Sequence, residues 1–455
     1  MSFFHGVLKD DGGLMPASQT TAVGGSDSQH LVWTMDRPTR AFSIKVVEPA
    51  EYRPADHGAL FMKVVSELIA PTPAALAGRE HEAQLYGSRH DRFDLTTFPE
   101  AFVDAHTLLV VLRAAAKLAD MGCIHVGLRA TDDPERHLFS LEQLRDFLGQ
   151  LREVGNLVLE DLVSFEGWLG RQSGGMFNVG CLFAVDTKGL RICLHPKMVR
   201  SQFEAHVLSE HHMVEANLVS LVTILPVDPA LMSITLQPLL CSDALDLPTD
   251  RPGGGPMKRL NHHVAAFDRP PDHVDVVSVA TCTPQPPGAI SKGGSRYRQW
   301  HDQFEKCFVD LAQGADFSRH HQAAMVLSNF REISEKEGGG LSGAFLPVPP
   351  PPGLDQPQLT VSCYGKDRER GGANRWSVPS DEALERWRTR GYVVGLNPFA
   401  LPDNAPVKVF SFTLQRLLRD TSRWRTDPVF SQAFIDAGYV DEDRIVFSAL
   451  GKTHV

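Results

Sequence analysis

The pattern of apolar residues in the first third of the chain switches repeatedly between the two-residue period of a strand and the 3.6-residue period of a helix. This pattern predicts strands at residues 41–47, 93–98 and 123–128 and helices at residues 59–70 and 106–121. Such a β-α-β-α-β order favours a layered α/β domain, because helices that connect strands cover the sheet that the strands form.

The rest of the chain suggests additions around this domain. Residues 1–40 are rich in Gly, Ser, Thr and Asp and are expected to be a flexible tail with a first ordered segment near residues 31–35. The main domain is expected to span residues 41–365, with a helical insertion at about 130–170 that opens on the cap signature Ser-Leu-Glu-Gln from Ser140. Residues 366–455 are expected to form a C-terminal extension, with a helix at 411–419.

Charge and composition exclude several classes of protein. The chain is 42% hydrophobic and 22% charged, as is typical of a globular protein with a sizeable core. It carries 45 basic and 55 acidic residues, a formal net charge of −10. This balance argues against a broad nucleic-acid-binding surface and against binding to an anionic membrane.

The cysteines and the apolar stretches indicate a compartment. The seven cysteines are spread singly, with no Cys-x-x-Cys pair, which favours reduced thiols and no structural zinc. We find no signal peptide and no apolar stretch long enough to cross a membrane. A cytoplasmic protein without a metal or cofactor is therefore expected.

Three reactive side chains each follow a predicted strand directly. Glu100 follows the strand in FDLTTFPEAF, Lys197 the strand in LRICLHPK, and Cys241 the strand in SITLQPLLCSDAL. In layered α/β folds, loops at the carboxyl ends of strands bring such groups into one crevice.

A carboxylate, an ammonium group and a thiol in one crevice would make a nucleophilic site. The thiol is competent as a thiolate, and a nearby lysine is expected to lower its pKa. Glu100 would take the thiol proton and later give it to a leaving amine. Lys197 would stabilise the oxyanion of the tetrahedral intermediate.

Each residue alone has an ordinary structural interpretation. A single cysteine is usually a small buried hydrophobic residue, a strand-end glutamate usually caps a helix, and a lysine usually lies at the surface. The functional interpretation depends on all three occurring together and in this order.

With these residues, the sequence resembles the carbon–nitrogen hydrolase (nitrilase/amidase) superfamily. FPEAF is similar to its glutamate motif, HPK to its lysine segment and LLCSDAL to its nucleophile motif, with Lys197 44 residues before Cys241. Weaker similarity follows in DVVSVAT, AAMVLSNFRE and GGGLSGAFLPVPPPPG. The resemblance covers roughly residues 41–365.

The resemblance implies a four-layer α-β-β-α sandwich that forms a homodimer through one helical layer. It also implies that Cys241 attacks an amide or nitrile carbon, that a thioester or thioimidate forms, and that water releases the product. The family uses a second glutamate after the lysine. Glu204 matches it best, and Glu210 and Glu215 are the alternatives.

The departures from the family pattern keep a second hypothesis open. Ser242 stands where the family usually has an aromatic residue, and the insertion and extension make this an enlarged, atypical member. The alternative is a catalytically degenerate binding or signalling module of the same fold. Such nucleophile segments are similar to enlarged nitrilase-like domains associated with phage defence. For the enzyme, the expected partner is a small amide or nitrile substrate.

Overall fold

The computed structural model describes most of the first two thirds of the chain and shorter stretches beyond it. The described residues are 18–23, 26–39, 41–69, 92–116, 122–131, 137–201, 204, 213–245, 249–250, 254–262, 273–282, 319–320, 323–330, 342–348, 360–363, 392–393, 407–418 and 421–435.

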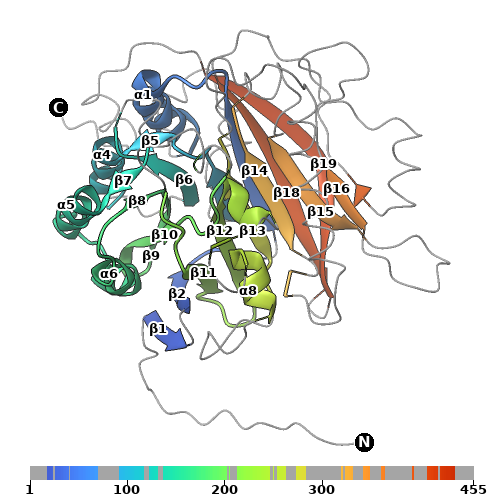
Figure 1. Cartoon of the computed structure of the whole chain (residues 1–455). Coiled ribbons are helices and arrows are strands. Elements are labelled where there is room, and N and C mark those ends of the chain that lie inside the picture. Colours follow the sequence, from blue (N-terminus) through green and yellow to red (C-terminus); the bar gives the residue numbers. More distant parts are fainter. Residues whose placement is uncertain are drawn as a thin grey trace, which may run out of the picture.

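Two large mixed sheets dominate these residues (Figure 1). The first sheet contains, in spatial order, β1 (Ser18–Val23), β2 (Ser26–Met35), β11 (Leu218–Pro226), β12 (Ile234–Leu240), β13 (Val276–Ala280), β14 (Ala324–Ser328), β15 (Gly343–Val348) and β16 (Thr360–Cys363), with β17 (Tyr392–Val393) beside β15. Strands β12, β13 and β14 run parallel, so their carboxyl ends lie at one edge.

The second sheet carries the β-α-β-α-β segment. Its spatial order is β10 (Gly189–Pro196), β9 (Val179–Asp186), β6 (Cys123–Arg129), β4 (Phe93–Thr97), β3 (Ala41–Pro49), β18 (Val407–Leu418) and β19 (Thr421–Ile435), with β5 (Val103–Asp104) beside β6. Strands β3, β4 and β6 are parallel, and β9 and β10 form an antiparallel hairpin. A small separate pair joins β7 (Phe139–Ser140) to β8 (Met176–Phe177).

The helices that pack against the second sheet lie on one side of the molecule (Figure 1). They are α1 (Pro54–Val64), which continues as a π-helix (Val65–Ile69), α4 (Ala105–Ala115), α5 (Leu141–Arg152) and α6 (Val163–Gly170). Helix α8 (Pro256–His262) lies near β11 and the turn at Cys241–Ala244. Two short 3₁₀ turns span Leu159–Leu162 and Cys241–Ala244.

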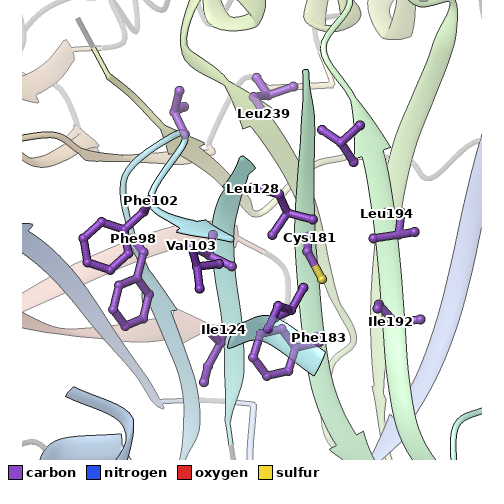
Figure 2. Packing of buried hydrophobic residues seen from close by; sticks show 14 of the residues in the cluster. Phe98, Phe102, Val103, Ile124, Leu128, Cys181, Phe183, Ile192, Leu194 and Leu239 are labelled. Atoms are coloured by element: carbon purple, nitrogen blue, oxygen red, sulfur yellow. The ribbon is translucent and has the colours of Figure 1, made fainter. Parts of the chain in front are cut away.

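The two sheets pack face to face through one buried apolar cluster. Both sheets contribute to it, with Trp33, Val222 and Leu236 from the first and Val46 and Leu95 from the second. A second cluster joins the other face of the second sheet to the helices. Figure 2 shows part of it: Phe98, Phe102, Val103, Ile124, Leu128, Cys181, Phe183, Ile192, Leu194 and Leu239.

The α/β class predicted from the sequence is confirmed: the fold is mixed α/β, with several sheets and a helical layer. The four-layer α-β-β-α sandwich that the resemblance implies stays a prediction. Among the described residues, no helix is long and apolar enough to span a membrane.

Local signals in the sequence match the structure well around α5. Ser140 accepts a hydrogen bond from the backbone of Gln143, and the Gln143 side chain accepts one from the backbone of Ser140, which completes a capping box. The turn at residues 186–188 joins β9 to β10 in a hairpin, with Gly189 paired to Asp186.

The helix predicted at residues 411–419 is wrong, because this segment belongs to strand β18. Val407 and Val409 are buried at two-residue spacing, which is the strand period, and β18 pairs with β3 along nine consecutive residues. Tertiary pairing with an existing sheet edge therefore overrides the local helical preference. Segments far apart in the sequence thus contribute strands to the two large sheets: β2 belongs to the first sheet and β18 to the second.

Candidate active site

The three reactive side chains predicted from the sequence follow the ends of three strands. Glu100 lies three residues after β4, Lys197 directly after β10, and Cys241 directly after β12. All three are buried, with exposed fractions of 3%, 2% and 1%. The site therefore lies between the two sheets' strand ends, where the surrounding protein strengthens electrostatic interactions.

The turn that carries Glu100 is held by a close backbone approach. Gly127 of β6 donates its backbone N–H to Pro99, and a side chain on Gly127 would lie 2.4 Å from the Cα of Glu100. Ala101, directly after the glutamate, has a φ of 51°, a left-handed conformation that is uncommon outside glycine. The surrounding structure thus maintains a strained turn, as is frequent at functional sites.

Lys197 is held between two carboxylates. Its Nζ lies 2.8 Å from Oε1 of Glu100 and 2.7 Å from Oε2 of Glu204. Glu204 is itself fixed, because its Oε2 accepts hydrogen bonds from the backbone and the hydroxyl of Ser201. The ammonium group is therefore immobilised rather than free to sample solvent.

Two polar residues that the sequence analysis did not single out complete this cluster. Asn178 donates from Nδ2 to Oε1 of Glu100 and to Oε1 of Glu204, both at 2.8 Å. Nε2 of His137 lies 3.7 Å from Oε1 of Glu204. The only sequence signal for Asn178 is a polar residue between Phe177 and Val179, at a point where the chain is about to enter a buried strand.

Of the two described candidates for the second glutamate, Glu204 is the one that contacts Lys197. Glu215 instead accepts hydrogen bonds from the backbone nitrogens of Arg200 and Asp250. Glu210 lies outside the described residues.

Cys241 begins a tight turn with an unusual backbone. Its φ is 40°, one of three positive values outside glycine among the described residues. The next two residues anchor this turn to the segment after Lys197: Ser242 donates to the carbonyl of Val199 at 2.5 Å, and Asp243 accepts the backbone N–H of Met198. The turn that begins at Cys241 and the segment after Lys197 are thus one structural unit.

The environment shifts the pKa values of the two glutamates in opposite directions. Burial alone would raise the pKa of Glu204, but Lys197 and His137 outweigh it and hold that pKa well below its usual range. Burial raises the pKa of Glu100, and the charge of Lys197 only partly opposes this. Two carboxylates whose pKa values are pushed apart are the arrangement expected of one fixed counter-ion and one proton-transfer group.

Lys197 stays a cation in this environment. Burial alone would lower its pKa, but the two glutamates and the neighbouring Cys241 outweigh burial and raise it. Lys197 is therefore a source of positive charge and hydrogen bonds, not a base.

The thiol does not behave as the sequence analysis expected. Burial and the charge of Glu100 raise the pKa of Cys241 above its ordinary value, and the opposing effect of Lys197 is smaller. Cys241 is therefore a neutral thiol. The backbone N–H of Cys282 lies 3.2 Å from Oε2 of Glu100 and also contacts the Cys241 sulfur, so the carboxylate and the thiol share one hydrogen-bond donor.

The described residues contain no cluster of three His, Cys, Asp or Glu side chains arranged to hold a metal ion. The side chains at the site supply a thiol, two carboxylates and a fixed cation.

Comparisons with known proteins give structural likenesses only. No protein-family model and no curated protein matches the sequence. Among solved structures, a cysteine-to-serine mutant of the Nesterenkonia AN1 amidase, from the nitrilase superfamily, aligns at 10% identity over 68% of this chain and 85% of its own, with a TM-score of 0.30.

Two further structures align at a similar level. An amidase from Nesterenkonia sp. aligns at 13% identity over 77% of this chain and 97% of its own, with a TM-score of 0.30. An N-terminal amidase with a Gln-Gly peptide aligns at 9% identity over 70% of this chain and 62% of its own, with a TM-score of 0.29. Likenesses this weak establish neither a shared fold nor an activity. The fold and site define a mixed α/β protein with a buried Glu–Lys–Glu–Cys cluster.

Proposed function

We propose that this chain is a thiol-dependent hydrolase of a non-peptide C–N bond, with an amide or nitrile as substrate and a cysteine acyl-enzyme as intermediate. The observation that carries the proposal is Lys197, buried and held at 2.8 Å and 2.7 Å between Glu100 and Glu204, beside the strained turn of Cys241. Burying three charges costs several kcal/mol unless each is compensated. If these side chains served packing alone, apolar residues of similar size would stabilise the fold better.

The proposed reaction follows from the protonation states. Glu100 takes the thiol proton as the Cys241 sulfur forms a bond to the amide carbon, and Lys197 stabilises the negative charge on the oxygen. Glu100 then gives the proton to the leaving nitrogen as the C–N bond breaks. In the second half, Glu100 takes a proton from water, the hydroxide oxygen attacks the thioester, and the thiol is restored. Glu204 keeps Lys197 in place throughout.

The raised pKa of Glu100 suits this role. A carboxylate with a raised pKa is a better base toward a thiol than one at the usual value of about 4.3, because the proton transfer is less uphill. The proton acquired by Glu100 is also retained until the leaving group needs it.

One observation favours the alternative, a catalytically degenerate binding or signalling module. Cys241 is only 1% exposed, and its pKa is raised rather than lowered. A site that never opens would hold an inert thiol. The two proposals differ in whether Cys241 supports turnover.

The test is ammonia release from a panel of small primary amides and nitriles at neutral pH. Cys241→Ala is compared with Cys181→Ala, which removes a thiol from the apolar core instead. We expect turnover by wild type and by Cys181→Ala, and none by Cys241→Ala. If no member of the panel is hydrolysed, or if Cys241→Ala retains full activity, the enzyme proposal fails and the binding module takes its place.

A further inference from the structure

Asn178 occupies the centre of the charged cluster. Its side chain is 1% exposed, and its Nδ2 donates to both glutamates at 2.8 Å. The amide group has only this orientation available, because the reverse one would place its oxygen against two carboxylate oxygens. The Oδ1 atom therefore points away from Glu100 and Glu204.

This oxygen has no hydrogen-bond donor among the described residues, although it is fully buried. A buried acceptor without a donor costs about 1–3 kcal/mol, so native proteins rarely leave one without a reason. The position of the atom suggests a reason: Asn178 and Lys197 both bond to Oε1 of Glu100. The unpartnered Oδ1 thus belongs to the same amide group whose Nδ2 contacts Glu100, the carboxylate that transfers the proton in the proposed reaction.

We propose that Oδ1 of Asn178 accepts an N–H of the leaving nitrogen and so selects primary amides over nitriles and esters. This inference rests on the proposed function. The nitrogen that receives a proton from Glu100 must lie within hydrogen-bond reach of that carboxylate, which is the neighbourhood of the unpartnered oxygen.

The step requires no further reactant. The sulfur–carbon bond forms, the C–N bond breaks, and the proton that left the Cys241 thiol passes through Glu100 to the nitrogen, which departs as ammonia. During this step Oδ1 holds one of the N–H groups and keeps the nitrogen lone pair directed at Glu100. A nitrile has no N–H before attack, and an ester has none at all, so neither can use this acceptor.

The experiment compares matched substrates that share an acyl group: acetamide, propionamide and benzamide, each with its methyl ester and its nitrile. The kcat/KM of each is measured for wild type, Asn178→Ala and Asn217→Ala. Asn217 is a matched control, because its side-chain oxygen accepts from Trp168 outside the charged cluster.

We expect Asn178→Ala to lower kcat/KM for the amide about 10- to 100-fold more than for the ester, which corresponds to the loss of one buried hydrogen bond. Asn217→Ala should change both by the same factor. A general loss of order around the two glutamates would lower amide and ester activity alike, so equal losses in Asn178→Ala overturn the inference while leaving the proposed function intact.

Wild type alone provides a second measurement if Asn178→Ala does not fold. We expect the primary amide to be hydrolysed at least about tenfold faster than the nitrile with the same acyl group, for the same hydrogen-bond reason. A nitrile that is hydrolysed as fast as its amide overturns the inference. If no amide, ester or nitrile is turned over, the proposed function fails, and this inference fails with it.

Discussion

The carboxylate of Asp243 lies 2.8 Å from the backbone nitrogen of Met198, the residue directly after Lys197. The same oxygen accepts the backbone N–H of Val199 at 2.8 Å, and the other oxygen accepts that of Leu240. Asp243 thus joins the turn that begins at Cys241 to the segment after Lys197. The distance between the Cys241 thiol and the Lys197 ammonium group therefore depends on the side chain of Asp243.

Asp243 should make stability depend on pH. Burial raises its pKa to about 7, although three backbone N–H groups favour the charged form. In the unfolded chain the value is about 3.9. Between about pH 4 and pH 7 the folded protein therefore holds a proton that the unfolded chain has lost, so the stability contributed by this group falls as the pH rises.

We predict that Asp243→Asn removes this part of the pH dependence. The measurement is urea unfolding of wild type and variant at a series of pH values from 4 to 8. The stability of wild type relative to the variant should fall across this range. Asp228→Asn is the control, because Asp228 is an exposed turn residue. A stability difference between wild type and Asp243→Asn that does not change with pH would contradict the prediction.

Glu204 and Glu215 form a matched pair of buried glutamates with different expected roles. Glu204→Gln removes the counter-ion of Lys197 that keeps its charge throughout the reaction, so the ammonium should move toward Glu100. We predict a fall in kcat of about 100-fold, as for a misplaced catalytic group, and a loss of about 3 kcal/mol in unfolding free energy.

Glu215→Gln should lower stability without a comparable loss of kcat, because Glu215 bonds to backbone groups of the neighbouring loops. Steady-state kinetics with the best amide substrate and chemical denaturation separate the two effects. Equal losses of kcat in the two variants would show that the assignment of Glu204 is wrong.

Gly180 lies where the two histidines of the core meet. A side chain on Gly180 would lie 2.3 Å from Cε1 of His195, and that ring is held by a 3.0 Å contact between its Nε2 and Nε2 of His125. Gly180→Ala should therefore destabilise the protein by about 1–3 kcal/mol through overpacking.

Gly149 is the matched control for this prediction. It lies in α5 on an exposed position, with no atom within 4 Å of an added side chain. Gly149→Ala should stabilise the protein by about 0.5–1 kcal/mol, because alanine loses less backbone freedom in a helix. Thermal unfolding of both variants checks the pair. A stable Gly180→Ala variant would indicate that the His125–His195 contact gives way easily.

The strands that carry Glu100, Lys197 and Cys241 could be located from the sequence, because each contains the two-residue alternation of apolar and polar residues that is typical of a strand, as in FDLT, LRIC and ITLQ. The residue after such a strand then lies at the end of the strand, where functional side chains gather in layered α/β folds. The capping box of Ser140 could be predicted for a similar reason, since all its hydrogen bonds lie within four residues.

The parts that could not be predicted depend on contacts between distant segments. Asn178 is part of the site because its side chain donates hydrogen bonds to Glu100 and Glu204, which are 78 and 26 residues away in sequence. The pKa of Cys241 has a direction opposite to the one expected, because burial and a carboxylate together exceed the effect of one lysine. Strand β18 has a local sequence compatible with a helix, and its pairing with β3 and β19 decides its conformation.

The central claim is that Cys241 becomes acylated during turnover. The most direct measurement is rapid-quench intact-mass spectrometry of wild type mixed with the amide that it hydrolyses fastest, followed by peptide mapping. We predict a mass increase equal to one acyl group, located on Cys241, that appears before steady state and is removed by hydroxylamine. Turnover without an adduct at Cys241, or with the acyl group on another residue, would contradict this account.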